Sequence, residues 1–167
     1  NIVAGVGRVQ VTVIDERVAA RRKNFAFYFD KLNGSWIDKK ALEAIGSNSA
    51  LTKREGSGIY FLKEPEGYSS NRWLTTILVN PSETGGVTND DIRIALEREN
   101  IESRPLWKPM HQQPLYKGAP YFGKGISDEL FKYGLCLPSG SNLTDNDMNS
   151  VVSVIKKTLH LKTKVLQ

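Results

Sequence analysis

RWLTTILV, residues 72–79, is the stretch of this chain that decides its fold. It is rich in β-branched and aromatic residues and is closed by Asn80 and Pro81, a combination that predicts a strand. The apolar run is nearly continuous, which is typical of a strand covered on both faces. We therefore expect a sheet with this strand in a buried position.

Shorter patterns before and after this stretch complete the predicted fold. Three further strands are predicted: 58–63 (GIYFLK), 101–106 and 135–137. Helices are predicted at 39–45, 88–99, 127–132 and from 144 onward, with Thr88, Ser127 and Thr144 as N-caps. The core-facing residues of the second and the last of these are Ile92, Leu96, Met148, Val151, Val152 and Ile155, with Ala95 as a further candidate. This order predicts an α+β layered domain, a small and mostly antiparallel sheet with helices on one side.

The first 32 residues carry a helical pattern. Two sets of apolar residues recur at helical spacing: Ile2, Val6, Val9 and Val13, then Ile14, Val18, Phe25, Phe29 and Leu32. They predict one long helix, bent in the middle, that ends at Asn33 and Gly34. At about 45 Å it would reach beyond a small domain. We therefore divide the chain into a helix at 1–33, linked to a large domain that is missing here, and a C-terminal α+β domain at 34–167.

Composition excludes several classes of protein. With 167 residues, 40% hydrophobic and 25% charged, the chain is expected to form one globular domain or one domain and a small annex. The 23 basic and 18 acidic residues give a net charge of +5, which is spread along the chain and does not favour a nucleic-acid-binding protein. No apolar run approaches the ~18 residues of a membrane span. The single cysteine, Cys136, suits a reducing compartment, so a cytoplasmic protein is expected.

The segment at 101–141, IESRPLWKPMHQQPLYKGAPYFGKGISDELFKYGLCLPSGS, differs from the rest. Prolines at positions 105, 109, 114 and 120 exclude a long helix from its first half. Cations and aromatic rings lie among them: Arg104, Trp107, Lys108, His111, Tyr116, Lys117, Tyr121 and Phe122. Rigid turns that present such groups suit an anionic ligand. The alternative is a proline-rich surface loop whose rings pack into the core.

Few catalytic patterns are present. His111, Cys136 and His160 are too scattered for close-spaced metal ligands, and GVGRVQ lacks the third glycine of a phosphate-binding loop. Cys136 could be a nucleophile activated by His111, but a lone cysteine between two leucines is more often a small buried apolar residue. We expect no metal site and no catalytic residue in this chain.

Three stretches resemble, in the same order, the C-terminal region of the DegT/DnrJ/StrS family of sugar aminotransferases: NIVAGVGRVQVTVIDERVAARRKNF, IESRPLWKPMHQQPLYKGAPYFG and GLCLPSGSNLTDNDMNSVVSVIKKTL. The resemblance covers nearly all of residues 1–161. It implies the small domain of a fold-type-I, pyridoxal 5′-phosphate-dependent enzyme that moves an amino group, usually from glutamate, to a keto nucleotide-sugar for surface polysaccharide or glycan biosynthesis. The Schiff-base lysine would lie in the missing large domain, so this piece alone would be inactive. Family members act as homodimers.

The resemblance also implies which residues meet the substrate. In the family, the segment at 101–123 lines the active-site entrance, so Arg104 and Lys108 would bind diphosphate or sugar oxygens and His111 would make a polar contact. Arg104 could instead hold the loop or the domain junction through hydrogen bonds to the backbone. Two other functions stay open: a stand-alone binding or assembly module of the same fold, and a basic nucleic-acid-binding domain.

Overall fold

The computed structural model describes residues 2–38, 41 and 57–165, and for 161–165 only the course of the backbone. At its centre is a five-stranded sheet in the order β1-β2-β3-β5-β4. The strands are β1 (Ser35–Ile37), β2 (Ile59–Leu62), β3 (Thr75–Val79), β4 (Arg104–Pro105) and β5 (Gly134–Leu137). β1 pairs with β2 in parallel and the other neighbours are antiparallel. The predicted α+β class with a mostly antiparallel sheet is confirmed.

Helices cover both faces of this sheet. The described helices are α1 (Ile2–Thr12), α2 (Ile14–Lys31), α4 (Asn89–Arg98), α5 (Ile126–Tyr133) and α6 (Asp145–Val165), and all but α1 pack on the sheet. Side chains of α2, α4 and α6 share one core with β2, β3 and β5, whereas Leu130 and Tyr133 of α5 pack against Tyr60 and Leu78 in a second core. The expectation that helices lie on one side is therefore wrong. The second face of β2 and β3 is apolar too, with Tyr60 and Leu78, and it also needs a covering helix.

β3 is the central strand, and it is buried on both faces as predicted. Ile77 and Val79 belong to the first core, and Leu78 between them belongs to the second. The strand begins at Thr75 and not at residue 72, because Arg72 has a left-handed backbone conformation with φ 50° that a strand cannot accommodate. The strand predicted at 101–106 is likewise shorter than expected, since β4 contains only Arg104 and Pro105.

The helix ends follow local chemistry. The Thr88 hydroxyl accepts a hydrogen bond from the Asp91 backbone, the Asp91 carboxylate accepts one from the Thr88 backbone, and Thr144 and Asp147 repeat this pattern at α6. The core-facing residues predicted for α4 and α6 are buried, except for the candidate Ala95, which is half-buried. Ser127 is not the cap of α5; Gly125 has that position, with a φ of 72° that favours glycine. The helix predicted at 39–45 lies outside the described residues, apart from residue 41.

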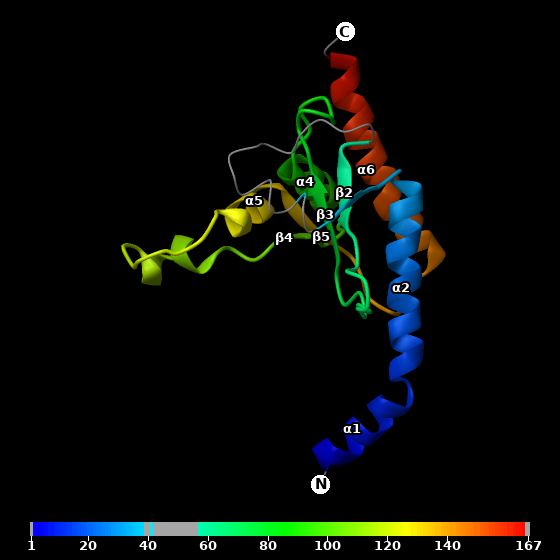
Figure 1. Cartoon of the computed structure of the whole chain (residues 1–167). Coiled ribbons are helices and arrows are strands. Elements are labelled where there is room, and N and C mark those ends of the chain that lie inside the picture. Colours follow the sequence, from blue (N-terminus) through cyan, green and yellow to red (C-terminus); the bar gives the residue numbers. More distant parts are fainter. Residues whose placement is uncertain (1, 39–40, 42–56, 166–167) are drawn as a thin grey trace.

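The N-terminal helix is broken at Val13 into α1 and α2, which confirms the predicted bend. α2 buries Asn24, Phe25 and Tyr28, while α1 buries no residue and extends away from the sheet (Figure 1). Ile14, one of the apolar residues at helical spacing, is 53% exposed. In the part of the chain that the structure describes, no helix combines the length and the apolar character needed to cross a bilayer.

Candidate functional site

A long excursion between β4 and α5, residues 106–125, projects away from the sheet and is called the arm below (Figure 1). It contains two short 3₁₀ helices, η1 (Met110–Gln112) and η2 (Pro114–Tyr116). Proline lacks a backbone donor, so longer helices cannot form here. The aromatic side chains are exposed, up to 93% for Phe122. The interpretation that these rings pack into the core of the chain is therefore wrong.

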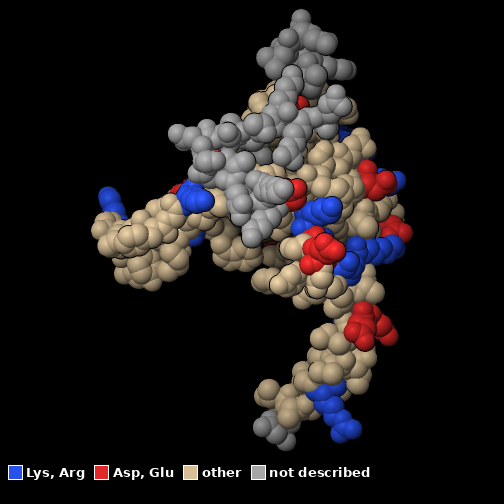
Figure 2. Space-filling view, in the orientation of Figure 1, with Lys and Arg blue, Asp and Glu red and all other residues tan. Residues whose placement is uncertain are grey.

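The arm and the strand that leads into it are cationic. From residue 103 to residue 125 the sequence contains Arg104, Lys108, Lys117 and Lys124 and no acidic residue. Figure 2 shows basic groups spread along the arm and not gathered at one point. A surface of one sign of charge attracts ligands of the other sign, so this one suits an anion.

Contacts between η1 and α5 close the base of the arm. Nε2 of His111 lies 2.7 Å from Oδ1 of Asp128, a residue in the first turn of α5, and the Gln112 amide donates a hydrogen bond to the same oxygen. The ring of Tyr121 lies against the His111 ring with centroids 4.0 Å apart. His111 is thus half-buried, and α5 determines the direction in which its ring points.

Asp128 is ionised in this position. Burial by itself would raise the pKa of Asp128, but hydrogen bonds from Gln112 and His111 outweigh burial and lower the pKa. An ionised carboxylate has no hydrogen to donate. The hydrogen in the contact with Asp128 therefore belongs to Nε2 of His111.

A cleft of about 400 Å³ lies beside β4, where β3 begins and β5 ends. Trp73 and Trp107 line it, with ring centroids 6.1 Å apart, and both indoles are more than half exposed. Arg104 and Glu102 supply its charged groups, and residues 136–139 line the other side. Two indoles beside a guanidinium group can contact both an apolar ring and an oxyanion.

The guanidinium of Arg104 pairs with Glu102 at an exposed position. Its Nε donates to Oε1 of Glu102 at 2.7 Å, and Nη2 contacts the same oxygen. The Arg104 side chain is 78% exposed, so water screens the pair, and it contributes little to stability. Within the described residues its hydrogen bonds go to Glu102 and not to the backbone, which argues against a role in holding the loop.

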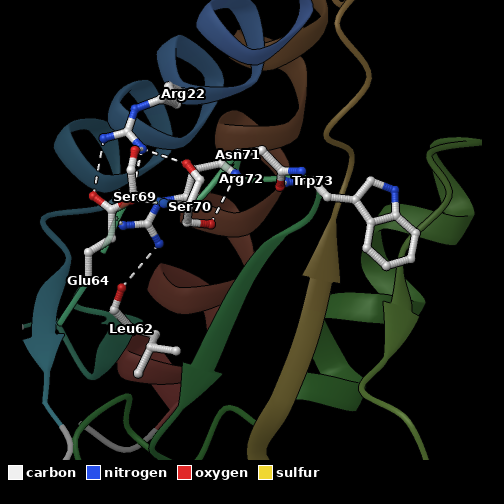
Figure 3. A network of polar contacts seen from close by, with 8 residues as sticks. All are labelled: Arg22, Leu62, Glu64, Ser69, Ser70, Asn71, Arg72 and Trp73. Carbon is white, nitrogen blue, oxygen red and sulfur yellow. Dashed lines mark hydrogen bonds and ion pairs between the residues drawn. The ribbon is translucent and has the colours of Figure 1, made fainter. Parts of the chain in front are cut away.

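Trp73 follows a loop that is anchored by Glu64 (Figure 3). The Glu64 carboxylate accepts hydrogen bonds from Arg22 at 2.8 and 3.1 Å and from the Ser70 backbone at 2.6 Å. Arg22 also donates to the Ser70 carbonyl oxygen at 2.5 Å. The hydrogen bond from Arg22, followed by that from Ser70, lowers the pKa of Glu64 to about 2. α2 and the loop before β3 are thereby joined.

Arg72 turns the chain from this loop toward the cleft. Its guanidinium lies over the Phe25 ring, 3.7 Å from the centroid, and donates to the Leu62 carbonyl oxygen at 3.2 Å. The backbone of Trp73 donates to Oδ1 of Asn71 at 3.0 Å, and Figure 3 shows the indole pointing away from the network. The left-handed residue that delays the start of β3 therefore also directs Trp73 outward.

Cys136 has no sign of nucleophilic character. It lies in β5 and is buried, and burial raises the pKa of its thiol, so the thiol remains protonated. The imidazole of His111 contacts Asp128 and Tyr121. The interpretation of Cys136 as a buried apolar residue is confirmed. Among the described residues, no group of three or more histidine, cysteine and acidic side chains could hold a metal ion.

The three residues predicted to bind substrate occupy different places. Arg104 lines the cleft, Lys108 is exposed on the arm, and His111 lies at the base of the arm. Their binding role stays a prediction. Sequence reasoning missed Trp73, which lay in a predicted strand, and Asp128, which resembles any acidic residue in the first turn of a helix. Asp128 is 17 residues from His111, a separation that signals no contact.

Comparison with known proteins identifies relatives of this chain. Residues 1–156 match the model of the DegT/DnrJ/EryC1/StrS aminotransferase family. The chain is similar to EpsN of Bacillus subtilis (strain 168), which carries the name of a pyridoxal phosphate-dependent aminotransferase; they are 38% identical over 164 residues, 96% of this chain and 36% of EpsN. It is 29% identical to GDP-perosamine synthase of Caulobacter vibrioides over 161 residues, 95% of this chain and 37% of that protein.

A solved structure shows a similar fold. The aminotransferase TlmJ from Streptoalloteichus hindustanus matches with a TM-score of 0.70 at 19% identity, over 95% of this chain and 36% of TlmJ. This likeness concerns the fold alone. The chain spans little more than a third of the length of the curated relatives that it matches.

Proposed function

Because this chain belongs to the DegT/DnrJ/EryC1/StrS aminotransferase family, we propose that it is the C-terminal part of an enzyme that aminates a keto nucleotide-sugar with glutamate as amino donor. The observation that carries the proposal is the family match over residues 1–156. The name of the relative GDP-perosamine synthase supports a nucleotide-linked sugar as substrate. We further propose a cytoplasmic homodimer that acts in the biosynthesis of surface polysaccharides or glycans.

The cleft beside β4 lacks one of the groups that a pyridoxal phosphate pocket needs. Such a pocket needs a lysine for the Schiff base and an acidic partner for the ring nitrogen. The lining of the cleft includes Arg104 but no lysine, and Lys108, Lys117 and Lys124 are exposed. We therefore assign the cofactor to the large domain expected before residue 1, and we expect the 167-residue chain alone to be inactive.

In this proposal the chain supplies binding groups for the substrate. The cationic arm attracts the diphosphate, and the forked guanidinium of Arg104 can bind two of its oxygens once Glu102 is displaced. Lys108 adds a point charge, and His111 meets a polar group of the nucleotide-sugar. The indoles at the cleft give an apolar surface to a ring of the substrate or to the large domain.

The decisive test is the coding sequence upstream of Asn1. The proposal expects a reading frame that supplies the Schiff-base lysine, and a full-length protein whose cofactor absorbance changes on reduction with borohydride. A panel of nucleotide-linked keto sugars is then assayed with glutamate by formation of 2-oxoglutarate. A reading frame that begins at or near Asn1, or a full-length protein without the cofactor, would refute the proposal.

Arginine substitutions test the binding role within the active full-length protein. Arg104→Ala is expected to raise the KM for the nucleotide-sugar about tenfold or more, because it removes a charged hydrogen-bond donor, with little change in kcat. Arg93→Ala is the matched control, since Arg93 pairs with Asp90 and Glu97 on the surface of α4. Equal KM values in both variants would contradict the assignment of Arg104.

A further inference from the structure

The contact between Asp128 and His111 joins the two ends of the arm. His111 lies in η1 shortly after the arm leaves β4, and Asp128 lies just beyond the turn at Gly125 where the arm enters α5. The Asp128 backbone donates to the Gly125 carbonyl oxygen at 3.1 Å, so the helix fixes the position of the carboxylate. An imidazole on a proline-rich segment is thus held by a residue on a regular element.

The carboxylate also determines which nitrogen of His111 is available. Oδ1 of Asp128 accepts from Nε2 at 2.7 Å in either charge state of the imidazole. Nδ1 is then the nitrogen left for a ligand, as an acceptor from a hydroxyl group when the ring is neutral and as a donor to an oxyanion when it is protonated. A carboxylate that selects one tautomer of a histidine in this way is a known means of orienting a functional imidazole.

Two further contacts restrict the imidazole. The Tyr121 ring lies against it with centroids 4.0 Å apart, and the Gln112 amide holds its partner by donating a hydrogen bond to the same Asp128 oxygen. The side chains of His111 and Asp128 are 24% and 29% exposed, so water screens their bond only in part. A rotation that turns the imidazole out of its plane would break the bond and the ring contact together.

We propose that Asp128 is a positioning residue, which holds His111 so that Nδ1 faces the polar groups of the nucleotide-sugar. The inference rests on the proposed function, and it deepens that function by assigning to α5 the control of a substrate-binding group on the arm. Asp128 itself touches no reacting atom.

A double-mutant cycle in the active full-length protein tests this inference. Asp128→Ala and His111→Ala are each expected to raise the KM for the nucleotide-sugar about tenfold while kcat changes less than about threefold. The double variant should be no worse than His111→Ala, because Asp128 acts through His111. Glu129→Ala is the control: it removes a carboxylate from the same helix turn, one that lies 3.9 Å from Nζ of Lys132.

Nitrogen-15 spectra of the imidazoles in the 167-residue chain give a readout independent of activity. The chain has two histidines, so His160 on α6 is an internal reference. At high pH, where imidazoles are neutral, His111 should carry its hydrogen on Nε2, and Asp128→Ala should convert it to a mixture of tautomers. Asp128→Asn keeps the side-chain volume but can accept or donate, so it should also give a mixture if Asp128→Ala fails to fold.

The outcomes separate the inference from the proposed function. Additive effects of the two substitutions, or a His111 tautomer that does not respond to Asp128, overturn the positioning role even when the enzyme is active. An unchanged KM in His111→Ala would show that His111 does not contact the substrate, and this result would overturn the inference as well. A full-length protein with no aminotransferase activity refutes the proposed function, and the spectra then still decide whether Asp128 selects the tautomer.

Discussion

Glu64→Gln removes the negative charge that joins α2 to the loop before β3. In the native chain this carboxylate is shared by Arg22, Arg72 and the Ser70 backbone. Glutamine has nearly the same shape and keeps one acceptor oxygen, so the substitution chiefly removes charge. The expected effect is a lower free energy of unfolding with no change of fold.

The size of the effect follows from the pKa. If the full fall from the ordinary value of 4.5 to about 2 were converted to stability, ionised Glu64 would contribute about 3 kcal/mol. The side chains of Arg22 and Glu64 are 41% and 24% exposed, however, so solvent screens the pair. Exposed pairs contribute about 0–1 kcal/mol. Between these limits we expect a loss of about 1–2 kcal/mol at neutral pH.

The dependence on pH has a definite sign. The pKa of Glu64 is lower in the folded state, so the unfolded state binds more protons between about pH 4.5 and 2. The stabilisation by Glu64 is therefore fully present above pH 4.5 and is lost as the pH falls toward 2. The difference between the native chain and Glu64→Gln should shrink over the same window.

Urea unfolding followed by circular dichroism, repeated from neutral to acidic pH, measures this difference. Glu66→Gln is the matched control, because Glu66 is exposed on the same loop, and it should change stability by less than about 0.5 kcal/mol. A Glu64→Gln loss that is the same at pH 7 and at pH 3 would show that the effect is not electrostatic. No loss at neutral pH would refute the reasoning outright.

Other substitutions test the caps and the cores. Thr144→Ala removes the N-cap of α6, which accepts from the Asp147 backbone, and should cost about 1 kcal/mol in urea unfolding, whereas Thr12→Ala at the exposed end of α1 should be near neutral. Ile77→Val removes one buried methylene from β3 and should cost about 0.5–1.5 kcal/mol by the same measurement; a neutral result would contradict its full burial. Cys136 should react slowly with a thiol reagent in the native chain and quickly in urea, and rapid native labelling would contradict its burial and its raised pKa.

Strands and helix caps that depend only on residues close together in the sequence could be predicted. GIYFLK contains β2, and the apolar run that ends at Val79 contains β3, because strand composition is a local property. Thr88 and Thr144 cap their helices because the side chain bonds the backbone three residues on. Three separated blocks of sequence also sufficed to identify the family, which the match over residues 1–156 confirms.

The candidate site depends on contacts that local sequence does not encode. Arg22 meets Glu64 across 42 residues, His111 meets Asp128 across 17, and the cleft requires Trp73 to lie beside Trp107. The two indoles meet because the strand order β3-β5-β4 brings together segments that are distant in the chain. Sequence alone thus determined β2, β3, β5, the helices α4 and α6 with their caps, and the family of this protein. Only tertiary structure decided which side chains face each other, because periodicity specifies the buried face of an element and not its partner.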